Sequence, residues 1–258
     1  MGKEGTMSSV RRARHLFQMG VLLLGGLFLA SGTSVEKRVQ EVTLKTTDGV
    51  KISATLHYPA RKRSKKSPAV ILIHQGGSDR TEWDPYVNTL LDSGYITCAY
   101  DVRGHGKSDK VASISALFND PEQAPNDLKA VLHHLRSLES VDGDRVAVVG
   151  ASIGANLACV AAGDARYGIK TAVAISAKTS AVHNLAGDAK NFHMRSVFYI
   201  SSMEQNGRRA RWAKELYDET GEPRKLEIVP DSRSHGVGIL KDAPGLVGKI
   251  TSWLAQTL

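Results

Sequence analysis

The chain has 258 residues, of which 41% are hydrophobic and 23% charged, and its formal net charge is +8. This composition excludes a collagen-like or intrinsically disordered chain, and the length suits one sizeable α/β domain. The excess positive charge lies in residues 1–32, with a net +3, and in the short loop 61–66, with +5. The rest is neutral overall, so the charge does not predict nucleic-acid binding, and the basic loop is interpreted as a solvated turn.

The first predicted element is a leader at residues 1–32. Arg11, Arg12 and Arg14 precede an apolar stretch at 16–30, which is short for a membrane-spanning helix and typical of a signal-peptide core. Small residues at its end predict cleavage after Gly32, and an uncleaved membrane anchor is the alternative. We therefore expect an exported protein, periplasmic or secreted, whose residues 33–258 form the α/β domain.

Strands and helices are expected to alternate along that domain. The predicted strands are 39–46, 50–58, 69–74, 95–100, 145–149, 169–176, 196–201 and 224–229, and the predicted helices are 83–93, 127–138, 155–162, 208–219 and 241–258. The first two strands alternate apolar and polar residues around Asp48-Gly49 and form an antiparallel hairpin. The later pattern predicts a mostly parallel, eight-stranded sheet with helices on both faces. Only 177–195 is long and irregular enough to hold a small lid, so little or no cap is expected.

The segment Gly150–Gly154 has the pattern G-x-S-x-G. It follows an apolar strand and precedes a helix-forming run. At such a junction the pattern predicts a nucleophile elbow, a sharp turn that exposes the hydroxyl of Ser152. The two glycines lack a Cβ and leave room where strand and helix crowd together. Ser152 is therefore the expected nucleophile, and an inert turn rich in glycine and serine is the alternative.

A serine nucleophile needs a base, and histidine suits neutral pH best. Of the nine histidines, His235 lies in a polar loop between the last predicted strand and the last helix. Loops at the carboxyl end of a parallel sheet meet at one edge, so His235 can reach Ser152. His133 and His134 lie in a predicted helix, His183 and His193 in the irregular segment and His57 on a strand, where surface or lid roles are expected for them.

Other functional classes find little support in the sequence. The chain has no GxxxxGKS or GxxxxGKT, so phosphate binding of the P-loop type is not expected. His133 and His134 are adjacent in a helix and point to different faces, and no cluster has metal-ligand spacing. No metal and no cofactor are therefore expected. The two cysteines, Cys98 and Cys159, are expected to be buried thiols that pack as small apolar residues.

Four motifs occur in a fixed order: His74-Gln75-Gly76-Gly77, Asp101 to Ser108, Gly150 to Gly154, and His235-Gly236. Together they resemble the α/β-hydrolase superfamily, and within it small esterases similar to dienelactone hydrolases. The resemblance spans residues 39–256 and implies the α/β-hydrolase fold. It also implies a structural role for the second motif, in which His105 orients backbone.

The resemblance further implies an oxyanion hole built from two backbone amides. One is the N–H of Ile153, and the second comes from the loop after His74. The superfamily usually has glycine next to this histidine, where this chain has Gln75. The usual spacing indicates Gly76 as the second donor, with Gln75 as the alternative.

The acid of the expected triad is less well defined. In the superfamily an Asp follows the strand that here runs over 196–201, but this chain has Gln205 or Asn206 at that place. Glu204 is the nearest carboxylate and is the favoured residue to orient His235. Asp188 and Asp231 are alternatives, and a Ser–His dyad without an acid is another.

These observations predict a serine esterase that acts on small or medium acyl esters through an acyl-enzyme on Ser152. Its expected partner is a small-molecule ester, and contact with a membrane is expected only through an uncleaved leader. A peptidase or thioesterase on the same fold is the first alternative. A non-catalytic binding protein, in which the altered acid position reflects lost chemistry, is the second.

Overall fold

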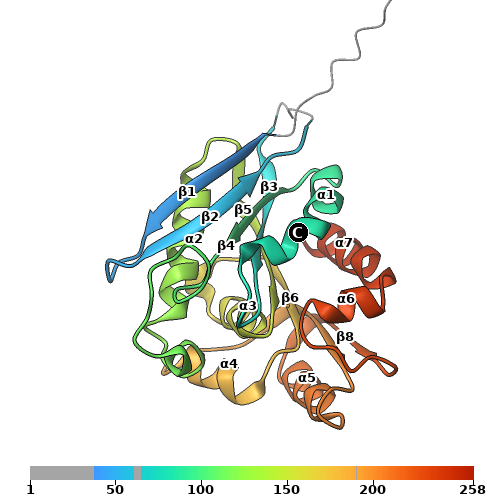
Figure 1. Ribbon diagram of the computed structural model, residues 1–258. Helices are drawn as coiled ribbons and strands as arrows, with labels where there is room; N and C mark the ends of the chain where they lie inside the picture. The colour runs from blue at the N-terminus through green and yellow to red at the C-terminus, as the bar shows by residue number, and fades with distance from the viewer. Residues whose placement is uncertain (1–37, 61–64, 190) are drawn as a thin grey trace, which may run out of the picture. The chain divides into compact units, whose positions relative to one another are not determined.

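The computed structural model describes residues 38–60, 65–189 and 191–258 (Figure 1). The predicted leader at 1–32 lies outside the described residues. None of the helices within those described ranges combines the length and the apolar character needed to cross a bilayer.

Eight strands form one sheet in the order β1-β2-β4-β3-β5-β6-β7-β8. Their bounds are β1 (Val39–Lys45), β2 (Lys51–His57), β3 (Ser67–Ile73), β4 (Ile96–Tyr100), β5 (Val141–Ala151), β6 (Thr171–Ile175), β7 (Arg195–Ser202) and β8 (Gly221–Val229). The pairs β1–β2 and β2–β4 are antiparallel and all the others are parallel. The sheet predicted from the sequence, including its N-terminal hairpin, is confirmed.

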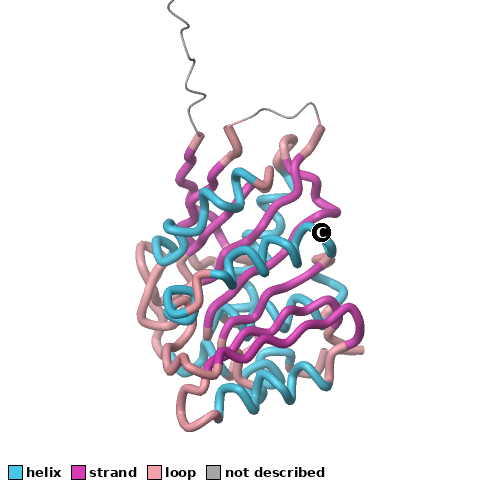
Figure 2. Tube along the Cα trace, turned by 90° about the vertical axis from the view of Figure 1, so that its right-hand side faces the viewer, coloured by secondary structure: helices cyan, strands magenta, loops and turns pink. Residues whose placement is uncertain are grey.

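Helices cover both faces of this sheet (Figures 1 and 2). On one face lie α2 (Ala124–Ser137), α3 (Ile153–Gly163), α4 (Thr179–Ala186) and α5 (Arg208–Asp218), and on the other lie α1 (Asp84–Asp92), α6 (Gly238–Asp242) and α7 (Gly245–Thr257). Three short 3-10 helices complete the described elements: η1 (Arg80–Trp83), η2 (Ile114–Phe118) and η3 (Ala165–Tyr167).

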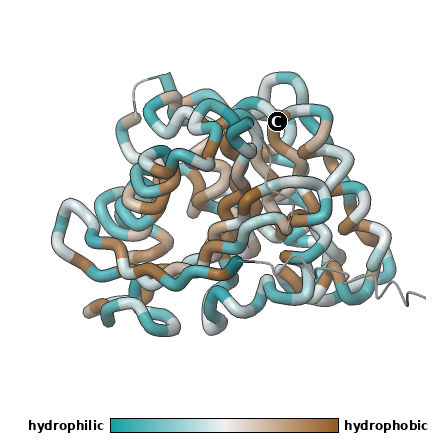
Figure 3. The backbone as a smooth tube through the Cα atoms, turned by 90° about the horizontal axis from the view of Figure 1, so that it is seen from above, coloured by the Kyte–Doolittle hydropathy of each residue, from teal (hydrophilic) through white to brown (hydrophobic). Residues whose placement is uncertain are grey.

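The core has two halves because strand side chains alternate between the faces of the sheet. In β3 every residue is buried; Ile71 and Ile73 pack toward α2 and α3, whereas Val70 and Leu72 pack toward α1 and α7. Seen from above, hydrophobic segments gather in the middle of the domain (Figure 3). Each such side chain stabilises the fold by about 1.5–3 kcal/mol when fully buried.

Two sequence predictions were wrong in part. The single helix expected at 241–258 is two helices, α6 and α7, because Pro244 lacks an N–H and disfavours helical geometry at Ala243. The segment 177–195 is not mainly irregular, since α4 occupies its first half and buries Val182 and Leu185. The predicted burial of the thiols is confirmed: Cys98 in β4 and Cys159 in α3 are free, and burial raises the pKa of each to about 12.

Candidate active site

Ser152 lies in a sharp turn between the end of β5 and the start of α3. Its backbone has φ 52° and ψ −107°, a conformation that non-glycine residues rarely adopt and that costs on the order of 1–3 kcal/mol. The turn is held because the N–H of Ser152 donates to the carbonyl of Ile175, at 2.8 Å, at the end of the neighbouring strand β6.

The flanking glycines are required by close backbone contacts. A Cβ on Gly150 would lie 2.0 Å from the carbonyl oxygen of Gly154, and a Cβ on Gly154 would lie 2.3 Å from the carbonyl oxygen of Ile73. Both distances are far inside van der Waals contact, and backbone atoms cannot move away cheaply. The pattern G-x-S-x-G is therefore a packing requirement of this strand-to-helix turn.

His235 and Glu204 contact each other directly. His235 Nδ1 lies 2.6 Å from Glu204 Oε2, and the two side chains are 29% and 20% exposed. A carboxylate accepts, so Nδ1 carries the proton and Nε2 is left as the acceptor. Of the three carboxylates considered from the sequence, Glu204 is the one that the structure places against the histidine.

The other two carboxylates lie elsewhere. Asp231 is exposed, and Asp188 lines a surface groove together with Pro121, Tyr167 and Leu185. Among the described contacts, no hydrogen bond or ion pair joins either of them to His235.

The loops that carry Glu204 and His235 are tied together by backbone and hydroxyl groups. Ser202 Oγ donates to the carbonyl of Ser234 at 2.7 Å, and the N–H of Met203 donates to the carbonyl of Ser232 at 3.0 Å. These hydrogen bonds fix the position of the loop after β7 relative to the loop after β8. The contact between Glu204 and His235 is thus supported by the main chain on both sides.

Arg209, which the sequence did not single out, lies behind Glu204. Its Nε is 3.6 Å from Glu204 Oε2, and its guanidinium carbon lies 5.0 Å from the ring centroid of Trp212. Burial lowers the pKa of Arg209. Its position in the first turn of α5 gives no sequence signal, because the contact depends on how β7 and α5 pack.

The end of β6 brings the elbow and the histidine loop together. Ser176 is buried with φ 62°, and its Oγ accepts the N–H of Gly236 at 3.1 Å, one residue after the carbonyl that holds Ser152. A Cβ on Gly236 would lie 3.5 Å from Cβ of Ala151. Ser152 and His235 therefore lie at the same edge of the sheet, although no hydrogen bond between their side chains occurs within the described residues. Such bonds are often long without substrate and tighten in the complex.

The loop after β3 is oriented by His74. The ring accepts the N–H of Val102 at Nε2, 3.0 Å away, so Nδ1 is protonated and donates to the carbonyl of Gln75 at 2.7 Å. Burial lowers the pKa of His74 to about 4, so the ring stays neutral. In a trans peptide the N–H points opposite to the carbonyl. The N–H of Gly76 therefore points away from His74.

The structure distinguishes the two amides considered for the second oxyanion donor. The N–H of Gln75 donates to Glu82 Oε2 at 2.9 Å and is occupied. The N–H of Gly76 has no partner among the described residues. Ile153, as the first residue of α3, also has an N–H without an acceptor inside its helix. Of the three amides considered, those of Ile153 and Gly76 are thus the ones without a partner in the described part of the chain.

The space around these groups is partly enclosed by η2. Cζ of Phe118 lies 4.0 Å from the position of a Cβ on Gly76, so this ring forms a wall beside the loop.

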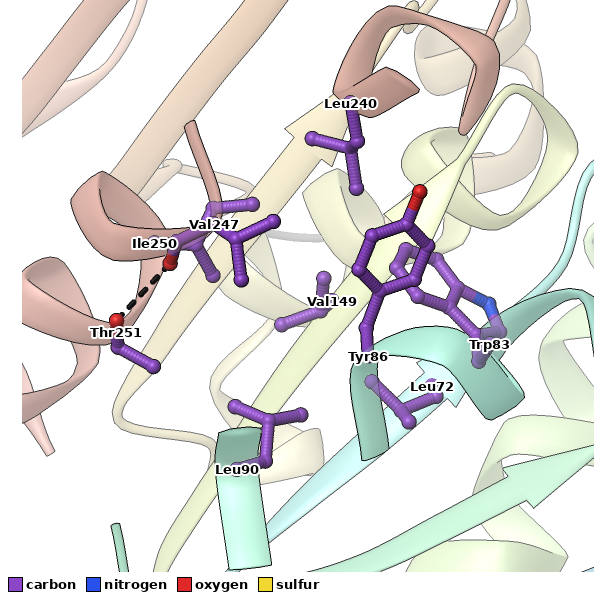
Figure 4. Close-up of a pocket in the computed structure, with 9 residues that line it drawn as sticks. All are labelled: Leu72, Trp83, Tyr86, Leu90, Val149, Leu240, Val247, Ile250 and Thr251. Carbon is purple, nitrogen blue, oxygen red and sulfur yellow. Dashed lines mark hydrogen bonds between the residues drawn. The ribbon is translucent and has the colours of Figure 1, made fainter. Parts of the chain in front are cut away.

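A separate apolar cavity of about 20 Å³ lies on the face of the sheet that α1, α6 and α7 cover. In it, Val149 lies between Val247 and Tyr86 (Figure 4). That volume is about that of one or two water molecules and is too small for an acyl chain. Within the described ranges, no group of three or more His, Cys, Asp or Glu is arranged to hold a metal ion.

Comparisons with known proteins bear on the family and the fold of the chain. A protein-family model described as "Serine aminopeptidase, S33" matches residues 64–216, more than half of the chain. The protein YcjY of Escherichia coli (strain K12) is 28% identical over 115 residues, which are 44% of this chain and 37% of YcjY. The chain thus spans just over a third of the length of that relative.

Solved structures share the fold over most of the domain. The esterase Pf2001 of Pyrococcus furiosus has a TM-score of 0.68 and 20% identity, covering 86% of this chain and 94% of its own. Dipeptidyl peptidase 4 of Porphyromonas gingivalis has a TM-score of 0.65 and 15% identity, covering 86% of this chain and 36% of its own. With the family match over more than half of the sequence, the chain belongs to the serine aminopeptidase S33 family of the α/β-hydrolase superfamily.

Proposed function

We propose that the protein is a serine hydrolase that cleaves small or medium carboxylic esters through an acyl-enzyme on Ser152. The observation that carries this proposal is the contact of 2.6 Å between His235 Nδ1 and Glu204 Oε2. It fixes the tautomer in which Nε2 is free to accept the proton of a serine hydroxyl. Binding alone does not require a His235–Glu204 pair or a strained Ser152 at the nucleophile elbow, so these groups favour a hydrolase over a non-catalytic binding protein.

The proposed reaction follows from these groups. Ser152 Oγ attacks the ester carbonyl while its proton passes to His235 Nε2. The amides of Ile153 and Gly76 donate to the oxyanion that forms, and His235 then gives the proton to the leaving alcohol. Water, deprotonated by His235, hydrolyses the acyl-enzyme and releases the acid. Glu204 stabilises the imidazolium during both halves of the reaction.

The environment of the site favours an ester over an aminopeptidase substrate. An aminopeptidase needs an anionic group to bind the ammonium of its substrate. Glu204 is already engaged by His235, and Glu82 by the amide of Gln75. Lys178, in the loop after β6, adds an exposed positive charge at the same edge of the sheet as the catalytic loops. The family description and the named peptidase nevertheless make peptide cleavage the second candidate, and thioesters would use the same groups.

The proposal is tested by labelling with a fluorophosphonate probe and by substrate series. Wild type is expected to be labelled at Ser152 and to hydrolyse p-nitrophenyl acetate, butyrate and octanoate, whereas Ser152→Ala does neither. Aminoacyl p-nitroanilides are expected to react much more slowly than the esters. Labelling absent from folded wild type would refute a serine hydrolase, and faster anilide cleavage would select the peptidase.

Export belongs to the same proposal. Its support is the apolar stretch at 16–30 behind three arginines. Cell fractionation tests it, because a cytoplasmic protein that still carries residues 1–32 would contradict export.

A further inference from the structure

The side chain of Gln75 crosses from the loop after β3 to the loop that carries His235. The N–H of Val237 donates to Gln75 Oε1 at 3.3 Å. A Cβ on Gly236 would lie only 1.9 Å from that same oxygen. Gly236, with φ 54°, therefore leaves the space that the amide of Gln75 occupies.

The main chain of Gln75 is held firmly at the other end of this bridge. Its N–H donates to Glu82 Oε2 at 2.9 Å, and its carbonyl accepts from His74 Nδ1 at 2.7 Å and from the N–H of Ser78 at 3.2 Å. Both backbone polar groups are thus engaged by neighbours on the same side of the site. Because the main chain of Gln75 is held in place, the hydrogen bond from Val237 to its side chain fixes the position of Val237 relative to the loop after β3.

Two successive amides of the loop that carries His235 are consequently held by residues that follow two different strands. Ser176, directly after β6, accepts the N–H of Gly236, and Gln75, in the loop after β3, accepts the N–H of Val237. The residue immediately before these amides is His235. Holding both peptides fixes where the Cα of His235 lies relative to the elbow and to the amide of Gly76.

We propose that Gln75 is a positioning residue. Its side chain couples the loop after β3, which carries Gly76, to the loop that carries His235, and so sets the distance between the Gly76 amide and the His235 ring. The proposal rests on the proposed hydrolase function. A glycine, the residue usual at this place in the superfamily that the sequence resembles, has no side chain and could not make the bridge. The coupling is therefore a property of the side chain present in this chain.

Three substitutions separate the hydrogen bond from simple packing. Gln75→Met keeps the length but loses the acceptor, Gln75→Glu keeps an acceptor oxygen, and Gln256→Ala is a matched control on the exposed face of α7. Since a displacement of about 1 Å in a catalytic group can cost about 100-fold in rate, Gln75→Met is expected to lower kcat about 10- to 100-fold and to change KM less than about threefold. Gln75→Glu is expected to recover most of kcat, and Gln256→Ala to match wild type.

A double-mutant cycle with Gly236→Ala tests the same contact from the other side. The added methyl group displaces Oε1 of Gln75 and breaks the bond to Val237, so Gly236→Ala is expected to lower kcat. In a Gln75→Ala background the bond and the side chain that the methyl group would meet are both absent, and only the cost of an alanine at positive φ remains. The fold loss caused by Gly236→Ala is therefore expected to be smaller in that background, and equal losses would overturn the proposal.

Hydrogen exchange at the backbone amide of Val237 tests the bridge without reference to activity. Exchange is expected to accelerate at least about tenfold in Gln75→Met and to stay near the wild-type rate in Gln75→Glu. If wild type fails to label with fluorophosphonate, the proposed function fails, whatever the exchange shows. If wild type is active but Gln75→Met keeps its kcat, or the exchange of Val237 does not change, the positioning role of Gln75 is refuted alone.

Discussion

Glu204 Oε2 lies 2.6 Å from His235 Nδ1, although the two residues are 31 positions apart and follow different strands. Bonds between the loops 202–203 and 232–234 hold the pair in register. A glutamate is one methylene longer than the aspartate usual at the acid position, and Glu204 comes before the place where that aspartate is expected. The longer side chain reaches the same imidazole nitrogen from a different backbone position.

The charge of Glu204 is expected to matter more than its hydrogen bond. Glu204→Gln retains the size of the side chain, but its neutral amide cannot stabilise an imidazolium. When the amide donates to Nδ1, the ring proton lies on Nε2, which can then no longer accept the serine proton. In the serine-protease template, the equivalent change lowers kcat about 10⁴-fold. We expect kcat for p-nitrophenyl butyrate to fall about 10²- to 10⁴-fold in Glu204→Gln, with KM little changed, measured by steady-state kinetics.

The other carboxylates supply the controls. Asp188→Asn and Asp231→Asn remove the same charge from residues that the structure places away from His235, and both are expected to stay within about twofold of wild type. If either of them lost activity as Glu204→Gln does, or if Glu204→Gln remained fully active, the assignment of the acid would be wrong.

The sequence was sufficient to predict the sheet because its signals are local. Apolar runs, the Asp48-Gly49 turn and the glycines around Ser152 each act through neighbouring residues, and the eight strands follow from them. The prediction of one helix at 241–258 was wrong because Pro244 interrupts the helix despite the periodic apolar pattern. No helix or strand was predicted in 111–123, because η2 is too short to show a detectable periodicity.

The partners within the site were harder to predict because they depend on packing between distant segments. Ser176, Arg209 and the side-chain role of Gln75 have no spacing signal; their contacts exist only when β3, β6 and β7 end at one edge. Glu204 was favoured from its nearness to the strand end, which limited the choice but did not give its distance from His235. Positive φ at Ser176 is likewise a consequence of tertiary contacts.

Gly76 is expected to act through its amide and not through its lack of a side chain. A Cβ at this position would meet only Cζ of Phe118, at an ordinary contact distance of 4.0 Å, so Gly76→Ala is expected to remain active. Gly76→Pro removes the N–H, and loss of one oxyanion donor costs about 10²- to 10³-fold in kcat. Equal kcat values for the alanine and proline variants in ester hydrolysis, with both proteins folded by circular dichroism, would exclude this amide from the oxyanion hole.

Phe118 is expected to influence substrate binding more than the chemical step. Its ring forms a wall beside Gly76 and offers apolar surface to an acyl or alcohol group. Losing about 1 kcal/mol of such contact raises KM about fivefold. We expect Phe118→Ala to raise KM for p-nitrophenyl octanoate by about that factor and to leave the acetate nearly unchanged. Val39→Ala, which trims an exposed side chain on β1, is the control, and a uniform change across all chain lengths would contradict a binding role.

His74 is expected to make the stability of the protein depend on pH. Burial lowers its pKa from 6.5 to about 4, so the unfolded chain takes up the proton first as the pH falls. The stability contributed by the neutral ring is complete above about pH 6.5 and is lost as the pH falls toward 4. From about pH 7.5 to about pH 5 this amounts to about 2 kcal/mol in the free energy of unfolding.

The comparison of wild type with His74→Asn isolates this contribution from other titrating groups. Burial raises the pKa of Asp127 to about 6, and that carboxyl works in the opposite direction, since the folded state then binds its proton more tightly than the unfolded chain. Asp127 is present in both proteins, so its effect cancels in the difference between their slopes. Urea unfolding at the two pH values should therefore show His74→Asn less stable than wild type at about pH 7.5, with the gap smaller by about 2 kcal/mol at about pH 5. If the difference in the free energy of unfolding did not change with pH, the ring would accept a proton as readily in the folded protein as in the unfolded chain. A hydrogen bond from the N–H of Val102 to a neutral His74 would then not be what holds this loop.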